Sequence, residues 1–179
     1  MRILIIGLVL ALAACRVERP EHIAPVSAFQ SERYLGTWYE IARIDNRFEK
    51  GLSRVSAEYK ANPDGGITVI NRGYEADSGQ WKQSIGKAYF VEGKDTGFLK
   101  VSFFGPFYGA YVVFDLDQDD YSYALVGGPD TSYFWLLSRS PGMDPVLRQA
   151  LIDKAVAKGY QRNRIINVAQ TAPVQSQRP

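Results

Sequence analysis

The sequence contains one cysteine and one histidine among its 179 residues, and these two shortages exclude several kinds of site. A single cysteine can form neither an internal disulfide nor a cysteine-based metal cluster. The only histidine, His22, lies in a proline-containing stretch before the folded region, so a Ser-His-Asp triad would require that stretch to fold back. We therefore predict no catalytic residue, no metal site and no cofactor.

The sequence also lacks a strong charge of either sign. Its formal net charge is +2, and +1 remains without the first fourteen residues, whose only charge is Arg2. So weak a charge gives no reason to expect a nucleic-acid partner. The residues are 46% hydrophobic and 13% aromatic, which is typical of a globular protein and favours strands over helices.

The first fifteen residues, MRILIIGLVLALAAC, are organised like a secretory signal. Arg2 provides a short positive region, residues 3–12 form an apolar run, and two alanines precede Cys15. Because the apolar run is too short for a permanent membrane span, we predict a signal peptide over residues 1–14.

The stretch Leu12-Ala13-Ala14-Cys15 resembles the lipobox of bacterial lipoproteins. The resemblance implies a diacylglycerol on the Cys15 sulfur, cleavage before Cys15, and acylation of the new N-terminus by a chain such as palmitate. Several acyl chains give durable membrane anchoring. Arg16 rather than Asp follows the cysteine, which in Gram-negative lipoproteins implies the outer membrane, and we expect the protein to face the periplasm. The alternative is an ordinary cleaved signal with a chance cysteine.

Two flanking segments show no periodic pattern. Residues 16–30 contain charges and two prolines, so residues 15–30 are predicted to be the lipidated cysteine with a flexible tether. The final residues, QTAPVQSQRP, are typical of a disordered tail. We place the folded domain at 31–168 and the tail at 169–179.

Between these segments, short runs rich in Val, Ile, Tyr and Phe alternate with turn signals, which is typical of antiparallel strands. A helical turn is expected at residues 31–35. Closing a meander of eight strands into a barrel removes its two exposed edges and leaves an interior that is filled or holds one small ligand. The predicted fold is all-β, an eight-stranded antiparallel up-and-down barrel. Its strands are predicted at residues 36–45, 53–61, 66–74, 80–91, 97–104, 109–117, 121–128 and 132–139.

One C-terminal α-helix is predicted to pack outside the barrel. Asp144 suits the N-cap, Pro145 suits the first helical position, and Gly159 suits the end. Apolar residues then recur at helical spacing and form one stripe. The stripe consists of Val146, Leu147, Ala150, Leu151 and Ala155. Residues 165–168 are expected to add a short ninth strand.

Three short motifs are expected to meet at one end of this barrel. Gly36-Thr37-Trp38 opens the first strand, Asp119-Asp120-Tyr121 lies in the turn after the sixth, and Arg139 closes the eighth. The guanidinium of Arg139 would stack over the Trp38 indole and close that end. The set resembles the three signatures of lipocalins, with Asp119 where Thr is usual. We assign a structural role to Gly36, Trp38, Asp120, Tyr121 and Arg139.

The resemblance extends to residues 34–43, 71–74 and 100–109, which look like the bacterial outer-membrane lipocalins, relatives of apolipoprotein D. It covers about residues 30–168 and the lipoprotein signal. It implies that the protein stores or transports fatty acids or lysophospholipids, that it maintains the envelope under stress, and that it is not an enzyme. It also allows a homodimer.

The ligand is expected inside the barrel, with the mouth at the end opposite the three motifs. Alternation from Trp38 and Arg139 points some residues inward, and composition and resemblance add others. The predicted ligand-binding residues are Glu40, Ala42, Ala57, Tyr59, Val69, Asn71, Tyr111, Val113, Tyr133, Trp135 and Leu137. A one-residue slip would turn a side chain to the opposite face. This mostly apolar lining suits an apolar chain with one polar end.

Several side chains near the mouth leave alternatives open. Glu40 needs a partner in an apolar interior, which Lys82 or another basic group would supply. Exposed aromatic residues would contact a membrane, a ligand or a second subunit, or would pack together as a lid. These aromatic residues are Phe48, Phe104, Phe107 and Tyr108. Nearby basic residues would meet a phosphate or carboxylate, or only face solvent. These basic residues are Arg43, Arg47, Lys50 and Arg54.

Two other functions compete with lipid binding. A lipid-modifying enzyme on the same scaffold is disfavoured because the sequence has neither a usable histidine nor a Gly-x-Ser-x-Gly motif. A structural envelope protein would have a filled barrel. An integral outer-membrane barrel is disfavoured because the charged strands and the helix need water.

Overall fold

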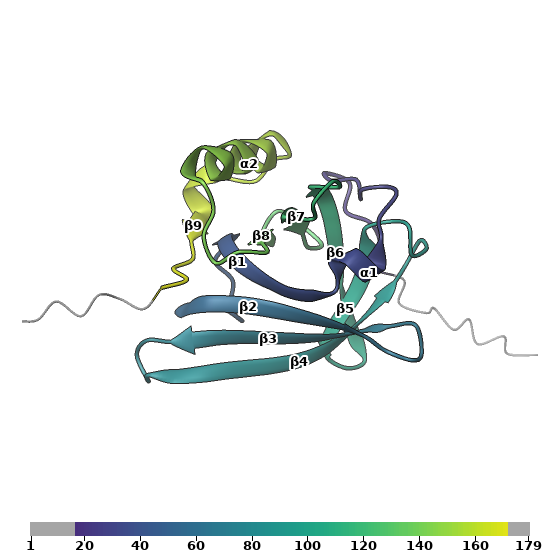
Figure 1. Ribbon diagram of the computed structural model, residues 1–179, viewed down its shortest axis with the longest axis horizontal. Coiled ribbons are helices and arrows are strands. Elements are labelled where there is room, and N and C mark those ends of the chain that lie inside the picture. The colour runs from purple at the N-terminus through teal and green to yellow at the C-terminus, as the bar shows by residue number, and fades with distance from the viewer. Residues whose placement is uncertain (1–16, 172–179) are drawn as a thin grey trace, which may run out of the picture.

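The computed structural model describes residues 17–171. The signal peptide predicted over 1–14, the lipidation site Cys15 and residues 172–179 of the predicted tail therefore lie outside the described residues. The described helices are α1 (Ser31–Tyr34), α2 (Pro145–Ala157) and the 3-10 turn η1 (Arg162–Arg164) (Figure 1). The described strands are β1 (Gly36–Ile44), β2 (Leu52–Ala61), β3 (Ile67–Glu75), β4 (Gln80–Phe90), β5 (Phe98–Phe104), β6 (Phe107–Leu116), β7 (Tyr123–Gly127), β8 (Phe134–Ser138) and β9 (Ile165–Asn167).

All eight predicted barrel strands are present, and each begins and ends within two residues of its predicted limits. The expected ninth strand and the helical turn before β1 are present as well. The limits agree because the turns are fixed locally. Between β2 and β3, for example, Gly65 adopts a positive φ of 81° and the Asn62 amide donates to the Gly66 carbonyl.

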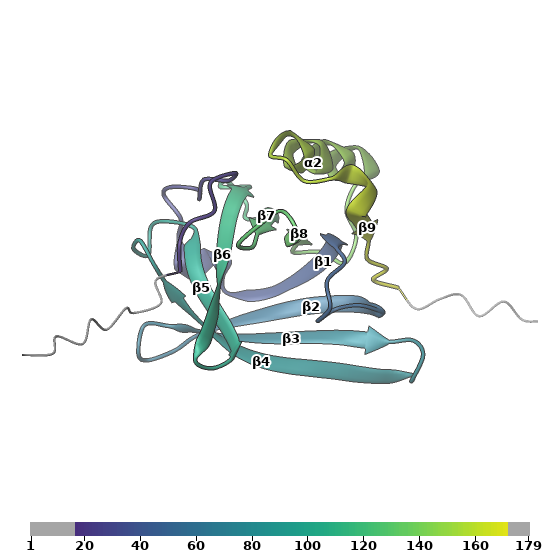
Figure 2. The ribbon, with the colours of Figure 1, turned by 180° about the vertical axis from the view of Figure 1, so that it is seen from behind.

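β1 closes the barrel because it pairs with strands from both ends of the meander. It lies antiparallel to β2 through residues 36–39 and to β8 through residues 39–43. The sheet order runs from β2 to β8 and returns to β1, so the predicted closed barrel is confirmed (Figures 1 and 2). Beyond Tyr39, β1 diverges from β2, and β9 pairs with residues 42–44.

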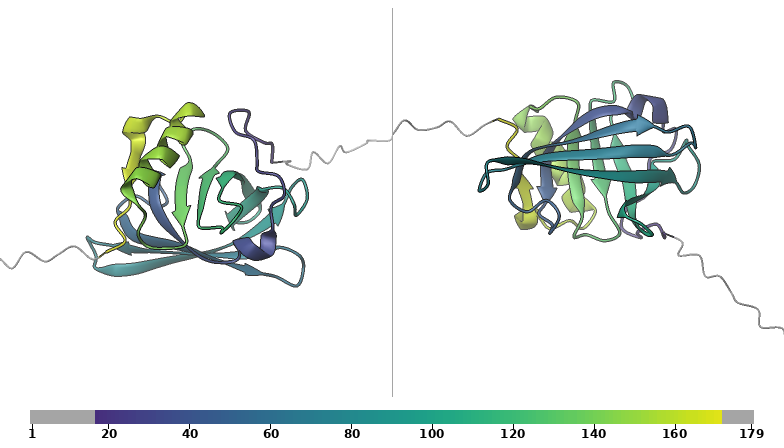
Figure 3. Two further views of the ribbon diagram at one scale, coloured as in Figure 1. Left: turned by 45° about the horizontal axis from the view of Figure 1, so that its top comes forward. Right: turned by 90° about the horizontal axis from the view of Figure 1, so that it is seen from below.

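Helix α2 packs on the outside of the barrel, as predicted, but only part of the predicted stripe faces the barrel (Figure 3). Leu151, Ile152 and Ala155 are buried against β1, β7 and β8, whereas the rest of the predicted stripe is exposed. Those exposed residues are Val146, Leu147 and Ala150. The first turn of α2 contributes a cap instead, because the Asp144 carboxylate accepts bonds from two of its amides. Neither α-helix of the described chain is long and apolar enough to cross a membrane.

The N-terminal segment contradicts the prediction of a flexible tether over residues 17–30. Ile23 and Phe29 are each only 3% exposed. The Val26 amide donates to the Val113 carbonyl at 2.9 Å, and the Val26 carbonyl accepts from the Gly97 amide at 2.9 Å. Apolar side chains among the charges and prolines therefore bind this segment to the barrel wall. The tail prediction is wrong at its start, because the Ala169 carbonyl accepts from the Arg54 amide.

We expect Leu151→Ala to lower the free energy of unfolding by about 2–5 kcal/mol, because it leaves a cavity between α2 and the barrel. Val146→Ala removes an exposed side chain of the same helix and should change stability by less than about 0.5 kcal/mol. Urea unfolding of both variants measures the difference. Equal losses would contradict the observed orientation of α2.

Candidate ligand-binding site

The closed end of the barrel is formed by an indole beneath a guanidinium. Trp38 is fully buried, and its Nε1 donates to the Tyr34 carbonyl at 2.8 Å. The Arg139 guanidinium lies 4.0 Å from the Trp38 ring centroid and donates to the carbonyls of Thr37 and Arg33. The stacking of Arg139 over Trp38 is the geometry expected from the sequence. Gly36 precedes this layer with a φ of 91°, a conformation that favours glycine.

The turn between β6 and β7 reaches the same end of the barrel. The Tyr121 hydroxyl accepts from the Gln30 amide at 2.9 Å, and the Arg33 guanidinium lies 4.3 Å from the Tyr121 ring centroid. The exposed Asp120 contributes its backbone amide, which donates to the Asp117 carboxylate. The three motifs therefore meet around α1, which lies across the closed end.

The barrel interior contains two adjoining cavities. The mouth cavity has a volume of about 840 Å³ and is bordered by residues 46–50, the β3–β4 hairpin and the β5–β6 hairpin. The inner chamber is smaller, about 70 Å³, and lies deeper in the barrel. The two cavities share the wall residues Glu49, Val55, Asn71, Val101, Phe103 and Trp135. A ligand entering at the mouth can therefore extend into the inner chamber.

Most of the predicted ligand-binding residues lie on the walls of these cavities. The inner chamber is lined by Glu40, Ala57, Tyr59, Val69, Asn71, Tyr111, Trp135 and Leu137. Tyr133 lies on the wall of the mouth cavity. Val113 is buried in the inner core but does not line either cavity.

Ala42 is a correction, because its side chain lies in the outer core rather than in the barrel interior. The register between β1 and β8 shifts between Glu40 and Ala42, so Ile41 has no partner in β8. Such a bulge reverses the alternation of the residues that follow it. Ala42 therefore faces outward and Arg43 takes the inward direction.

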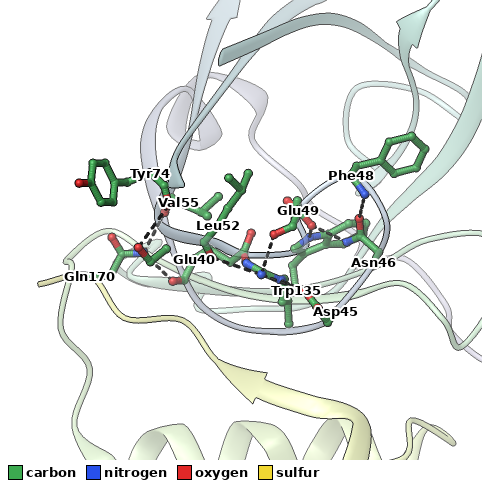
Figure 4. A network of polar contacts seen from close by, with 12 residues as sticks. Glu40, Asp45, Asn46, Phe48, Glu49, Leu52, Val55, Tyr74, Trp135 and Gln170 are labelled. Carbon is green, nitrogen blue, oxygen red and sulfur yellow. Dashed lines mark hydrogen bonds and ion pairs between the residues drawn. The ribbon is translucent and has the colours of Figure 1, made fainter. Parts of the chain in front are cut away.

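Arg43 is the basic group that pairs with Glu40, and Glu40 lies in the polar network shown in Figure 4. The two side chains are almost fully buried, and Arg43 Nη1 donates to Glu40 Oε1 at 2.9 Å. Arg43 also contacts the Asp45 carboxylate and donates to the Glu49 and Leu52 carbonyls. It is therefore fully engaged in structure and is not free to meet a ligand. Lys82, the residue named first as the partner of Glu40, pairs with Glu75 instead.

A second carboxylate, Glu49, lies beside Glu40 and lines both cavities. Glu49 Oε2 accepts hydrogen bonds from Trp135 Nε1 and Asn46 Nδ2. Burial raises the pKa of the Glu40 carboxyl well above its usual value, and the neighbouring Glu49 carboxylate raises it further, against the attraction of Arg43. The wall of the inner chamber therefore favours a proton on Glu40.

Three tyrosine hydroxyls meet at the inner chamber, and we call these residues the tyrosine cluster. Tyr111 lies in the middle, with its hydroxyl 2.7 Å from those of both Tyr34 and Tyr59. Burial raises the pKa of all three phenols, so they remain neutral hydrogen-bonding groups. Tyr59 and Tyr111 line the chamber, while Tyr34 connects it to the Trp38 layer.

The mouth carries exposed aromatic and basic side chains. Phe48, Phe104 and Phe107 are 56%, 70% and 79% exposed, so they do not pack together as a closed lid. Tyr108 lies instead against Tyr89 and Lys100. Of the four basic residues predicted to lie near the mouth, Arg47 and Lys50 line the mouth cavity.

Arg54 has a different environment from the other basic residues near the mouth. Its guanidinium lies 3.6 Å from the Tyr74 ring centroid and 5.0 Å from that of Trp81. The residue is not part of either cavity wall. Its role is therefore to pack the β2–β3–β4 wall of the barrel.

Sequence reasoning missed several wall residues that a regular alternation could have found. Val55 continues the inward series of Ala57 and Tyr59, and Val101 and Phe103 alternate along β5. In β5 the signal was present, because the polar residues Lys100 and Ser102 alternate with Leu99, Val101 and Phe103. Glu49 lies in a loop, where no periodicity could have identified it.

His22 lies away from both cavities. Its Nε2 is 3.1 Å from the Tyr160 hydroxyl, in a segment packed outside the barrel. Between residues 17 and 171, no three His, Cys, Asp or Glu side chains gather in a way that could hold a metal ion.

Comparison with known proteins gives matches over nearly the whole described chain. The family model described as a lipocalin-like domain matches residues 29–170. The outer membrane lipoprotein Blc of Vibrio cholerae is 55% identical over 151 residues, covering 84% of this chain and 88% of that protein. Apolipoprotein D of Mus musculus is 30% identical over 149 residues, covering 79% and 77%.

A solved structure gives the same fold at much lower identity. Insecticyanin from the tobacco hornworm Manduca sexta superposes with a TM-score of 0.66 and 19% identity, covering 87% of this chain and 88% of that one. At this identity the likeness concerns the fold alone.

Glu40→Gln should flatten the dependence of stability on pH. The folded protein raises the pKa of Glu40 above the usual 4.5, so the contribution of the protonated carboxyl is complete below that value. It declines as the pH rises through the raised folded pKa, and the wild type should lose stability there relative to Glu40→Gln. Urea unfolding between pH 4 and 9 measures this.

Glu58→Gln provides the matched control. Hydrogen bonds from Lys60 and Arg72 lower the pKa of Glu58, so this variant should show no gain at high pH. Parallel profiles for the wild type and Glu40→Gln would contradict the proposed protonation of Glu40.

Proposed function

This chain is a member of the lipocalin family, and we propose that its barrel binds a lipid with a single apolar chain, either a fatty acid or a lysophospholipid. The observation that carries this proposal is the mouth cavity of about 840 Å³ that continues into the inner chamber. Its volume is within the range of small-molecule sites, and most of its deeper wall is apolar or aromatic. A structural protein with a filled barrel would not need such a space.

The apolar chain is proposed to enter the barrel, with its polar group near the rim. Val55, Val69 and Leu137 offer apolar surface in the depth of the site. Arg47 and Lys50 lie on the wall of the mouth cavity, and among residues 17–171 neither forms an ion pair. These two cations suit a phosphate or carboxylate held at the rim.

We further propose that the protein is anchored in the outer membrane through acyl chains on Cys15 and faces the periplasm. The lipobox-like sequence before Cys15 and the name of the Vibrio cholerae relative, outer membrane lipoprotein, support this location. A role in envelope maintenance under stress follows from the resemblance to the bacterial outer-membrane lipocalins. The exposed aromatic residues at the mouth support a homodimer, which light scattering of the purified protein would measure.

Binding rather than catalysis fits the chemistry of the interior. Glu40 is the carboxyl that a lipid-modifying enzyme would use, but it is bonded to the buried Arg43. The phenols of the tyrosine cluster have raised pKa values and therefore resist deprotonation. Lipid turnover by the wild type that is abolished in Glu40→Gln would favour the enzyme instead.

Native mass spectrometry of delipidated protein tests the proposed function. Titration with hexadecanoate and with a C16 lysophospholipid should give saturable complexes of defined stoichiometry. If neither lipid shows saturable binding, the proposed function is wrong.

Ala57→Trp should weaken lipid binding at least about tenfold, because an indole on this wall would fill much of the inner chamber. Ala61→Trp provides the control, since Ala61 is exposed at the end of the same strand. Competition with a fluorescent fatty acid gives both affinities. Unchanged binding in Ala57→Trp would show that ligands do not use the inner chamber.

A further inference from the structure

The inner chamber is polar in a way that a plain acyl chain does not require. Its wall combines apolar residues with Tyr59, Tyr111 and Asn71. With about 70 Å³, it has room for a few water-sized groups, which is the size of a chain end rather than a whole lipid head group. The polar atoms around it therefore define the chemistry of whatever part of the ligand reaches this depth.

The tyrosine cluster has one O–H proton more than its internal hydrogen bonds use. Its three hydroxyls supply three O–H protons, but only two hydrogen bonds connect them, Tyr34–Tyr111 and Tyr59–Tyr111. Among residues 17–171 no further acceptor contacts these hydroxyls, so one O–H remains available. A buried donor without an acceptor is costly, and a ligand or a water that supplies the acceptor is favoured.

Asn71, on the same chamber wall, has an acceptor oxygen that lacks a hydrogen-bond donor. Its Oδ1 is buried and has no hydrogen-bond partner among the described residues. Asn71 lies on β3 opposite Ala57, two residues along from the Tyr59–Val69 pair, and on the same face. When Tyr59 or Tyr111 carries the spare proton, the chamber presents one donor that lacks an acceptor, beside the Asn71 oxygen that lacks a donor.

The charges around the chamber restrict the group that can meet these two atoms. Glu40 and Glu49 both lie on its wall, and the positive charge of Arg43 is already shared between carboxylates and backbone carbonyls. A carboxylate or phosphate would therefore meet the Glu49 carboxylate and find no free cation to pair with. An ammonium group has no acceptor to offer the spare tyrosine proton. A hydroxyl is neutral and is both donor and acceptor.

We propose that the inner chamber binds a hydroxyl group carried by the ligand, which accepts a hydrogen bond from the tyrosine cluster and donates one to Asn71 Oδ1. This inference rests on the proposed function, because it concerns the deep end of the same lipid site. It extends the ligand class to lipids with a hydroxylated chain. The inner chamber would select these ligands by binding their hydroxyl group.

A matched pair of ligands tests this site: hexadecanoate and 16-hydroxyhexadecanoate, in competition with a fluorescent fatty acid. An apolar floor would weaken binding of the hydroxy acid about tenfold or more, because its hydroxyl would be buried without partners. In the wild type we expect the hydroxy acid to bind at least as tightly as hexadecanoate. Hydroxy-acid binding that is tenfold weaker would overturn the proposal.

Variants identify the groups responsible. Tyr59→Phe/Tyr111→Phe removes the chamber donors, and Asn71→Leu removes the acceptor. Each should weaken the hydroxy acid about tenfold relative to hexadecanoate, whose own binding shows that the variant is folded. Tyr74→Phe removes a phenol outside both cavities, on the same strand as Asn71, and should leave the ratio unchanged. An unchanged ratio in both chamber variants would show that only water occupies the site, and would overturn the proposal.

A third ligand distinguishes the source of the hydroxyl. 1-Hexadecanoylglycerol carries its hydroxyls at the head-group end, so dependence of its binding on Asn71 and Tyr59/Tyr111 would support hydroxyl recognition with the head group entering first. Dependence confined to 16-hydroxyhexadecanoate would support recognition of the chain end. Absence of binding by all three ligands would overturn the hydroxyl site, and the proposed function is also wrong if the C16 lysophospholipid fails to bind as well.

Discussion

Ile41 has no partner in β8, and this one unpaired residue in β1 controls how the interior of the barrel is arranged. Before it, Trp38 and Glu40 point inward, and after it Ala42 turns to the outer core. Arg43 then points inward, three residues after Glu40, and the two side chains pair at 2.9 Å. A buried carboxyl group in an apolar barrel needs such a hydrogen-bonding partner, because a buried polar or charged group without one is costly. The bulge therefore makes a polar cavity wall compatible with a stable fold.

The same part of β1 is where its pairing with β2 ends. Beyond the Tyr39–Ser56 pair, the Gln170 side chain donates to the carbonyls of Glu40 and Val55. A side-chain amide thus replaces strand pairing at this seam, with hydrogen bonds of 2.7 and 2.8 Å. The C-terminal segment after β9 is consequently part of the barrel, which explains why the domain extends beyond residue 168.

The sequence was most informative where local chemistry decides the structure. Glycine, proline and aspartate fixed the turns, so all eight strands could be located, and Trp38 with Arg139 identified the closed end. Prediction failed where tertiary contacts decide which side chains face the barrel interior or become buried. The bulge at Ile41 gives no signal in the residue pattern, so Ala42 was placed inside. The stripe on α2 was misjudged because Val146 and Leu147 are as apolar as the residues that the barrel buries.

The packing of residues 17–30 has a mechanical consequence for the proposed lipid anchor. A flexible tether would let the barrel sweep a hemisphere a few tens of ångströms in radius. Only two peptide units separate Cys15 from Val17, which packs against the outer core, and two extended residues span at most about 7 Å. A barrel held so close to the membrane would move laterally along the membrane surface, together with its lipid anchor. Its encounters with lipids would then be a two-dimensional search over the leaflet surface rather than a three-dimensional search through the compartment.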